Sequence, residues 1–231
     1  MTRGLRIAVT SLKGAVAVFV VQHPFGVEYS SSLKPALSAA GFKVVYETSY
    51  ALGVADLSAQ INAAKAAKPD SLIAISYPPD TFMITEQSIA NGFTPKVRFL
   101  GVGSAFPNYK GKFGDKVNGI LGLGGFDPAA PGMKAYFERH KAVNKGQEPD
   151  RWASPNTYAG LQVLQQAIET VGEIDNAKIL AAMKTGTFKT IIGDLKLTGN
   201  RNPSLWHVGQ WQNGEFYGLA PTNRPGAKQP I

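Results

Sequence analysis

An apolar run, Ala15–Val21, constrains the fold of this chain more than any other feature of its sequence. Continuous runs of β-branched and apolar residues are typical of strands that are buried on both faces of a parallel sheet. Pro24 and Gly26 follow the run, and both residue types interrupt regular structure. The sequence therefore predicts a buried strand that leads into a loop over His23–Gly26.

Helices and strands alternate after this first strand. The expected elements are a helix over Val27–Ala40, a strand over Phe42–Glu47, a helix from Asp56 or Ser58 to about Ala67, a strand over Ser71–Ser76, a helix capped by Asp80 that ends near Asn91, and strands over Lys96–Leu100 and Val117–Gly124. This alternation is the signature of an α/β lobe with a parallel sheet. Glycines between positions 101 and 125 predict close approach of backbone segments.

The character of the sequence changes near Phe126. The expected elements are helices over Met133–Lys145, Ser154–Val171 and Asn176–Met183, short strands over Thr190–Ile192 and Asp194–Leu197, and a hairpin of Leu205–Gln212 with Glu215–Tyr217 around Asn213-Gly214. Helices with apolar faces need a surface to cover, and this region predicts little strand material. Either these helices pack on the first lobe, or the sheet that they would cover is missing.

Composition excludes several classes of function. The chain has 231 residues and a net charge of +8, but its basic residues are scattered and not interleaved with aromatics, so nucleic-acid binding is not expected. It has no cysteine, and its His, Asp and Glu residues show no metal-ligand spacing, so neither a metal nor a cofactor is expected. No apolar run reaches the roughly 18 residues of a membrane span. The segment Met1–Val9 does not resemble a secretory signal.

Two short motifs are typical of penicillin-recognising serine enzymes. Ser31–Lys34 matches S-x-x-K and Lys184–Gly186 matches K-T-G. The chain has no S-D-N motif, however, and Lys184 stands at the end of an expected helix rather than on a strand. The glycines after residue 100 do not form a dinucleotide-binding motif behind the first strand. The sequence therefore does not predict an enzyme.

Several segments, taken in order, resemble the type I periplasmic binding proteins of ABC transporters, in the branch that binds leucine, isoleucine and valine. The segments that carry this resemblance are Val16–Gly26, Asp56–Gln60, Pro69–Tyr77, Thr157–Gln162 and Thr187–Leu195. They are similar to the strand and Y-G loop that open the C-terminal lobe of the family, and to its D-F-S, P-D-V-V, Y-D-A and F-x-T-x-x-G-P-L segments. The resemblance covers about Val16 to Tyr217.

The resemblance implies a type I periplasmic-binding-protein fold with two lobes. Residues 13–125 together with 205–220 would form a ligand-binding lobe, with a parallel sheet and flanking helices. Residues 126–200 would form the mostly helical, incomplete remainder of the second lobe, and residues 221–231 a flexible tail. The first strands and helices of the second lobe have no counterpart in this sequence, which is expected of a truncated reading frame or a natural remnant.

Ligands of open α/β sheets bind beyond the carboxyl ends of the strands. By the resemblance, Phe25 packs against the ligand and Ser76 and Tyr77 offer hydroxyls; the alternatives are a core aromatic and a polar pair bonded to the backbone. Gly103 and Ser104 stand where Leu/Ile/Val binders place the glutamate that holds the ligand ammonium. A buried ammonium without a carboxylate is costly. We therefore expect a neutral or acidic ligand, such as an aromatic carboxylate, a keto acid or an amide.

The function that the resemblance implies is the substrate-binding component of an ABC importer for branched-chain amino acids or related small molecules. Its partners would be the small-molecule ligand and a membrane permease, and its location the periplasm. The alternatives are a cytosolic small-molecule sensor or regulator with the same fold, or a non-functional truncated fragment. Helices with uncovered apolar faces also predict self-association.

Overall fold

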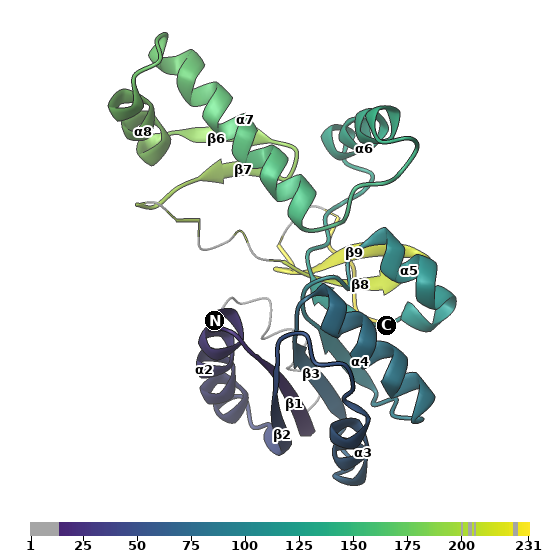
Figure 1. Cartoon of the computed structure of the whole chain (residues 1–231). Coiled ribbons are helices and arrows are strands. Elements are labelled where there is room, and N and C mark those ends of the chain that lie inside the picture. The colour runs from purple at the N-terminus through teal and green to yellow at the C-terminus, as the bar shows by residue number, and fades with distance from the viewer. Residues whose placement is uncertain (1–13, 200, 203–204, 206, 224–225) are drawn as a thin grey trace.

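The first lobe, in the lower half of Figure 1, is built around a mixed sheet. The computed structural model describes residues 14–199, 201–202, 205, 207–223 and 226–231. The elements of this lobe are β1 (Ala15–Gln22), α2 (Pro24–Ala39), β2 (Lys43–Ala51), α3 (Ser58–Ala66), β3 (Ser71–Ile75), α4 (Pro78–Ala90), β4 (Val97–Leu100), α5 (Pro107–Phe113), the 3-10 helix η1 (Gly114–Val117), β5 (Leu121–Leu123), β8 (Val208–Gln212) and β9 (Glu215–Ala220). Within the described residues the sheet has seven strands in the order β2-β1-β3-β4-β5-β8-β9. The predicted α/β fold is confirmed.

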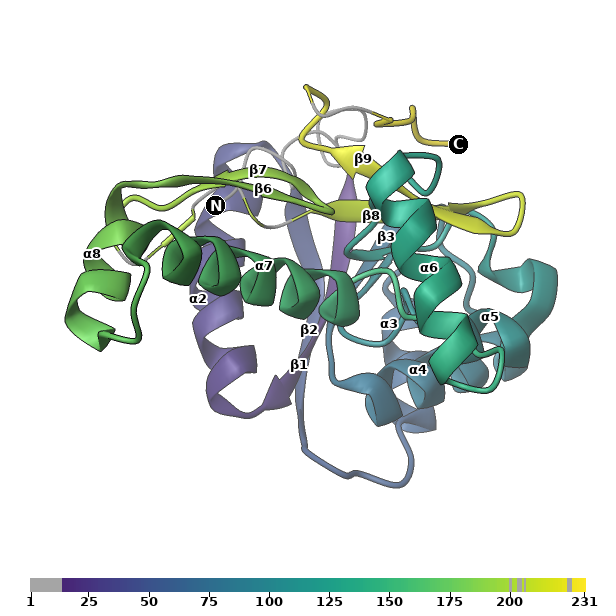
Figure 2. The same ribbon diagram turned by 90° about the horizontal axis from the view of Figure 1, so that it is seen from above.

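Strand β1 is buried on both faces, as its uninterrupted apolar sequence predicts. Ala17, Phe19 and Val21 enter the core beneath α3, α4 and α5, whereas Val16, Val18 and Val20 enter the core beneath α2. Figure 2 shows α2 on one side of the sheet and the other three helices on the opposite side. Two layers of helices therefore enclose the central strands, which fixes the ends of these strands in place.

Prolines begin helices of this lobe that the sequence predicted to start later. α2 begins at Pro24 rather than Val27, and α4 at Pro78 rather than at a cap on Asp80. α5, which was not predicted, begins at Pro107. Proline suits the first helical position because its fixed φ is helical and its missing N–H needs no partner there. The expected loop over His23–Gly26 is therefore the first turn of a helix, and that expectation was wrong.

The second lobe carries the remaining helices and a small antiparallel ribbon. Its elements are α6 (Pro131–Val143), α7 (Ala153–Val171), α8 (Asn176–Thr185), β6 (Thr187–Thr190) and β7 (Gly193–Lys196). Its core gathers Phe126, Met133, Val163, Phe188 and Leu195. The predicted helices are confirmed within a few residues, and so is the scarcity of strand material among the described residues. None of the described helices is long and apolar enough to cross a membrane.

The second lobe is tied to the first by the loop that precedes α7. The Arg151 guanidinium lies between two carboxylates, with Nε 2.9 Å from Glu215 Oε1 on β9 and Nη2 2.8 Å from Glu148 Oε2. The Arg151 backbone N–H donates to the carbonyl of Ala105, and its carbonyl accepts from Gly125 N–H. This junction fixes the angle at which α7 leaves the first lobe.

The described part of the tail forms neither helix nor strand, yet it lies against the sheet. Gln212 Nε2 donates to the carbonyl of Gln229 at 2.7 Å, and Ile231 N–H donates to Gln210 Oε1 at 3.0 Å. These bonds engage side chains of β8 that are themselves buried. That residues 221–231 are flexible stays a prediction.

Candidate functional site

The candidate site lies at the carboxyl ends of β1, β3 and β4. These strands are neighbours and parallel, with Val20 opposite Ile75 and Ala74 opposite Leu100. Segments that follow parallel neighbours leave the sheet at the same edge. The structure therefore brings the three predicted segments, which begin at His23, Ser76 and Gly101, to a common edge.

An aromatic cluster occupies this edge, made of His23, Phe25, Tyr29 and Tyr77. The Tyr77 hydroxyl is hydrogen bonded to His23 Nδ1 at 2.9 Å, and the two rings meet edge to face. The Phe25 ring lies 5.4 Å from the ring of Tyr77 and 5.9 Å from that of Tyr29. All four side chains are half-buried. The cluster thus presents an apolar surface with a hydrogen-bonding pair at its margin.

The two predicted serines are buried and bonded within the protein. Ser76 Oγ lies 2.7 Å from Thr81 Oγ1, which itself donates to the Val102 carbonyl, so Ser76 is the donor to Thr81. Ser104 Oγ donates to the Leu100 carbonyl at 2.8 Å, and both serine residues are 0% exposed. These bonds join the segments after β3 and β4. That either serine binds ligand stays a prediction, and it would require their hydroxyls to exchange partners.

The backbone at Gly103 leaves no room for an acidic side chain at that position. Its φ is +102°, a conformation that favours glycine, and an added Cβ would lie 2.9 Å from Cα of Pro78. A glutamate at position 103 would therefore collide with the start of α4. The turn is also held by Trp211, whose Nε1 donates to the carbonyl of Ser104 at 2.7 Å.

The acidic residue next to this edge, Asp80, is almost fully buried, with 1% of its surface exposed. Burial raises the pKa of its carboxyl group, against the lowering effect of hydrogen bonds from the Tyr77 backbone and the Tyr50 hydroxyl. It accepts from Tyr77 N–H at the first turn of α4. Asp80 thus accepts a backbone hydrogen bond inside the protein, and it offers no exposed negative charge to a ligand cation.

Two helices, α2 and α4, begin at this edge, directly after β1 and β3. The amino end of a helix carries a partial positive charge and backbone N–H groups without helical partners, and both favour an anion. The first turn of α2 has no acidic residue to neutralise this effect, whereas the first turn of α4 contains Asp80 and begins with two prolines that have no N–H. The start of α2 therefore suits a carboxylate better than an ammonium group.

The predicted site residues lie at or behind this edge, and that they bind a ligand stays a prediction. Phe25 and Tyr77 lie together in the aromatic cluster, whereas Ser76, Gly103 and Ser104 are buried behind it. The predicted site residues include neither His23 nor Tyr29. The repeated signal that could have located the cluster is an aromatic residue before a helix-starting proline, as in His23-Pro24 and Tyr77-Pro78.

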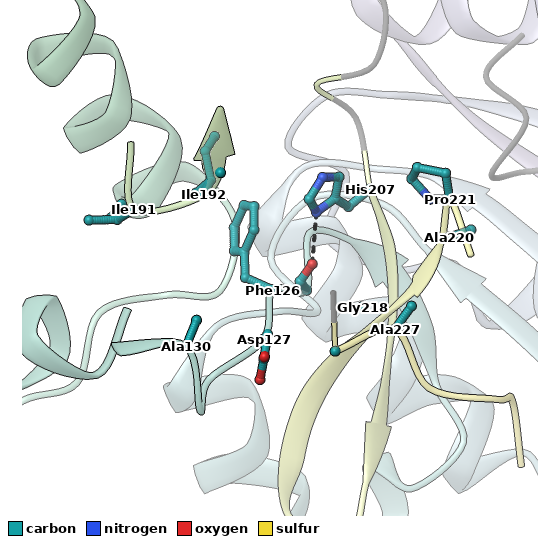
Figure 3. A pocket seen from close by; sticks show the side chains of 13 residues that line it. Phe126, Asp127, Ala130, Ile191, Ile192, His207, Gly218, Ala220, Pro221 and Ala227 are labelled. Atoms are coloured by element: carbon teal, nitrogen blue, oxygen red, sulfur yellow. Dashed lines mark hydrogen bonds between the residues drawn. The ribbon is translucent and has the colours of Figure 1, made fainter. Parts of the chain in front are cut away.

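A hollow of about 150 Å³ lies at the junction of the lobes (Figure 3). It is lined by residues of the first crossover such as Phe126, by Ile191 and Ile192 of the turn between β6 and β7, and by His207. His207 Nδ1 is 2.9 Å from the Gly125 carbonyl oxygen, which holds the imidazole against the crossover. Sites for small molecules usually exceed about 300 Å³. This hollow is therefore too small to be the principal ligand site.

Comparison with known proteins places the chain in a family. The profile of the family described as "Periplasmic binding protein" matches residues 1–215, which extends the predicted resemblance toward the N-terminus. The chain belongs to this family. It is 29% identical over 204 residues to the Leu/Ile/Val-binding protein homolog 1 of Brucella abortus, a match that covers 86% of this chain. The predicted membership is confirmed.

Solved structures of periplasmic binding proteins share the fold. The leucine binding protein of Thermotoga maritima aligns with a TM-score of 0.78 and 27% identity, over 94% of this chain and 64% of its own. A solute-binding protein of Rhodopseudomonas palustris, solved in complex with benzoate, aligns with a TM-score of 0.76 and 19% identity, over 93% of this chain and 62% of its own. The chain spans 54% of the Brucella relative. It therefore matches about half to two-thirds of these proteins.

Proposed function

We propose that this chain supplies the ligand-binding lobe of a solute-binding protein that serves an ABC importer. The observation that carries this proposal is the aromatic cluster at the carboxyl edge of the sheet, where His23 and Tyr77 are hydrogen bonded beside the ring of Phe25. The Brucella relative is named as a homolog of a Leu/Ile/Val-binding protein. The location would be the periplasm, and the partner a membrane permease. Closure of two lobes on the ligand would complete the site.

The ligand that this edge favours is a small carboxylate with an apolar or aromatic body. The rings of Phe25 and Tyr77 would pack against that body, and the His23–Tyr77 pair with the amino end of α2 would face the carboxylate. A free α-amino group would find no exposed carboxylate in the predicted loops, because Gly103 excludes a side chain and Asp80 is buried. The leucine and benzoate named for the two solved structures show that this fold accepts either class.

The contacts of Ser31 and Lys34 argue against a hydrolytic function. Ser31 Oγ donates to the Glu28 carbonyl within its own helix, and Lys34 Nζ pairs with Glu47 at 2.9 Å. Neither side chain is arranged as a nucleophile with its base, which requires a hydrogen bond between the two. A cytosolic sensor with the same fold is a weaker alternative, since the named relatives are binding proteins. We therefore propose that the chain binds its ligand and does not catalyse a reaction on it.

A thermal-melt series tests this proposal. The purified chain would be melted with a panel of branched-chain and aromatic amino acids, aromatic carboxylates, keto acids and short amides. A ligand at about a hundred times its Kd adds ~2.7 kcal/mol of stability. We expect a rise in Tm with one of the carboxylate classes. A rise with α-amino acids alone would contradict the ligand class but keep the binding function.

Two tyrosine variants connect the effect to the site. Tyr77→Phe removes the hydroxyl that bonds His23 but keeps the ring, so it should reduce the ligand-dependent rise in Tm. Tyr46→Phe, on β2, is the matched control and should leave the rise unchanged. No rise with any compound, or an equal rise in both variants, would overturn the proposed site.

A further inference from the structure

The segment of residues 226–231 is bonded to the last two strands of the first lobe. Lys228 N–H donates to the Gly218 carbonyl of β9 at 2.9 Å. On β8, the Gln212 side chain bonds the backbone of the segment at 2.7 Å and the Gln210 side chain at 3.0 Å. Both glutamines are buried and bond each other at 2.9 Å. Because a buried amide that loses its partner is costly, these bonds oppose release of the segment.

The same segment touches the crossover that leads from β5 into the second lobe. Gly226 lies against the side chain of Asp127, so closely that an added Cβ would overlap it. Asp127 Oδ1 accepts from the N–H of Ala129 at 3.0 Å, just before α6. Gly218 of β9 also packs on this crossover, because a Cβ added at Gly125 would lie 2.8 Å from its Cα. The segment therefore contacts both the sheet and the chain that joins the lobes.

The hollow at the junction separates this segment from the second lobe. Gly226 and Ala227 line it from the segment, whereas Ile191 and Ile192 line it from the turn between β6 and β7 (Figure 3). Rotation of one lobe against the other moves that turn relative to the first lobe. The segment does not move with the turn, because it is bonded to β8 and β9. The width of the hollow is therefore coupled to the angle between the lobes.

We propose that residues 226–231 act as a strap that limits rotation of the second lobe about the crossover. The bonds to β8 and β9 anchor the strap, its contact with Asp127 restrains the crossover, and Ala227 limits the approach of the β6–β7 turn. The strap lies beyond residues 1–215, which the family profile matches. A junction held near one angle has less conformational freedom to lose when a ligand binds. The inference does not depend on the ligand or on the proposed function.

Spin labels on the two lobes test the proposal without a ligand. The chain has no cysteine, so Leu52→Cys and Leu180→Cys, at positions 51% and 47% exposed, place one label on each lobe. Double electron–electron resonance measures the distribution of distances between the labels, and its width reports the range of lobe angles. The labelled pair would be combined with deletion of residues 226–231 and, separately, with Gly226→Ala.

The matched control is Gly41→Ala. Gly41 has a φ of +81°, close to the +74° of Gly226, but an added Cβ at Gly41 meets open space. We expect the deletion and Gly226→Ala to widen the distribution by about twofold and Gly41→Ala to leave it unchanged. Equal widening by Gly41→Ala, or an unchanged width in the folded Gly226→Ala protein, would overturn the proposal.

Hydrogen exchange of the unmodified chain provides a second measurement, which stands even if the deletion prevents folding. The amides of Lys228 and Ile231 donate hydrogen bonds to the first lobe, so we expect them to exchange more slowly than amides of an unstructured peptide. Exchange at the unstructured rate would show that residues 226–231 are a flexible tail, and it would also overturn the strap.

Discussion

The two lobes differ in how completely their helices are covered. In the first lobe, Phe19 and Leu37 reach 0% exposure because helices enclose both faces of the sheet. In the second lobe, Met133 is buried to a similar degree, but Val143, Leu161 and Leu180 keep 80%, 60% and 47% of their surface exposed. The helices of the second lobe thus leave more apolar surface open than the helices that cover the two faces of the central sheet.

This contrast separates local from non-local determinants of structure. α7 forms over the range that its apolar periodicity predicts, and Gly172 ends it in a left-handed conformation with φ of +77°. Local sequence is therefore sufficient to define the helix. Leu161 and Leu164, on the opposite side of the helix, remain exposed among the described residues, so their surroundings are not set by the helix itself.

Matched leucine truncations should show the largest difference between the lobes. Leu72 on β3 is 1% exposed, and Leu195 on β7 is 8% exposed. Leu72→Ala should lower the free energy of unfolding by about 3–5 kcal/mol, and Leu195→Ala by about 2 kcal/mol, because a looser site relaxes around the cavity. Urea denaturation followed by circular dichroism measures both values. Equal losses would show that the second lobe is packed as tightly as the first.

How far the sequence predicts the structure depends on which residues carry the signal. The apolar run of β1 and the Asn213-Gly214 turn were predicted correctly, because each is displayed by one short, continuous stretch of sequence. The predicted start of α2, at Val27, is wrong because Pro24 is a first helical residue here and does not interrupt the helix. Proline supports both interpretations, and the capping context decides between them.

The candidate site was predictable at the level of loops but not of side chains. Strand order placed the segments of Phe25, Tyr77 and Gly103 at one edge, which follows from general rules for parallel sheets. The burial of Ser76 depends on Thr81 and Val102, which no local pattern joins to it. Hydrogen bonds between distant segments are set by tertiary packing, and a single sequence does not display them.

The junction between the lobes offers a second comparison of buried and exposed charge. The Arg151 side chain is 7% exposed, and burial would lower its pKa, but the hydrogen bonds and charges of Glu215 and Glu148 hold the pKa above its ordinary value. Arg151→Met should cost about 3 kcal/mol of stability, because it leaves the partly buried carboxylate of Glu215 without its cation. Lys34→Met, which breaks an exposed pair with Glu47, is the control and should cost about 0–1 kcal/mol. Similar costs in urea denaturation would show that the junction contributes no more than a surface pair.

The smallest expected effect is a difference in pH dependence between Asp80 in the first lobe and Glu148 at the junction. Burial raises the pKa of Asp80, so its favourable contribution is present below its unfolded pKa and is lost as pH rises through the folded pKa. Burial would also raise the pKa of Glu148, but hydrogen bonds and charges from Arg151 and Lys141 hold it below its ordinary value. Its contribution is present above the unfolded pKa and is lost as pH falls through the folded one.

The isosteric amides Asp80→Asn and Glu148→Gln separate the two predicted dependences of stability on pH. The free energy of unfolding from urea denaturation would be measured at intervals between about pH 3 and pH 7, the range in which carboxyl groups titrate. Relative to the unmodified chain, Asp80→Asn should gain stability as pH rises, and Glu148→Gln should lose it. Parallel curves would mean that the first lobe does not penalise a buried charge more than the junction does. Opposite slopes would show that the dense core disfavours ionisation, whereas the junction between the lobes stabilises it with a cation.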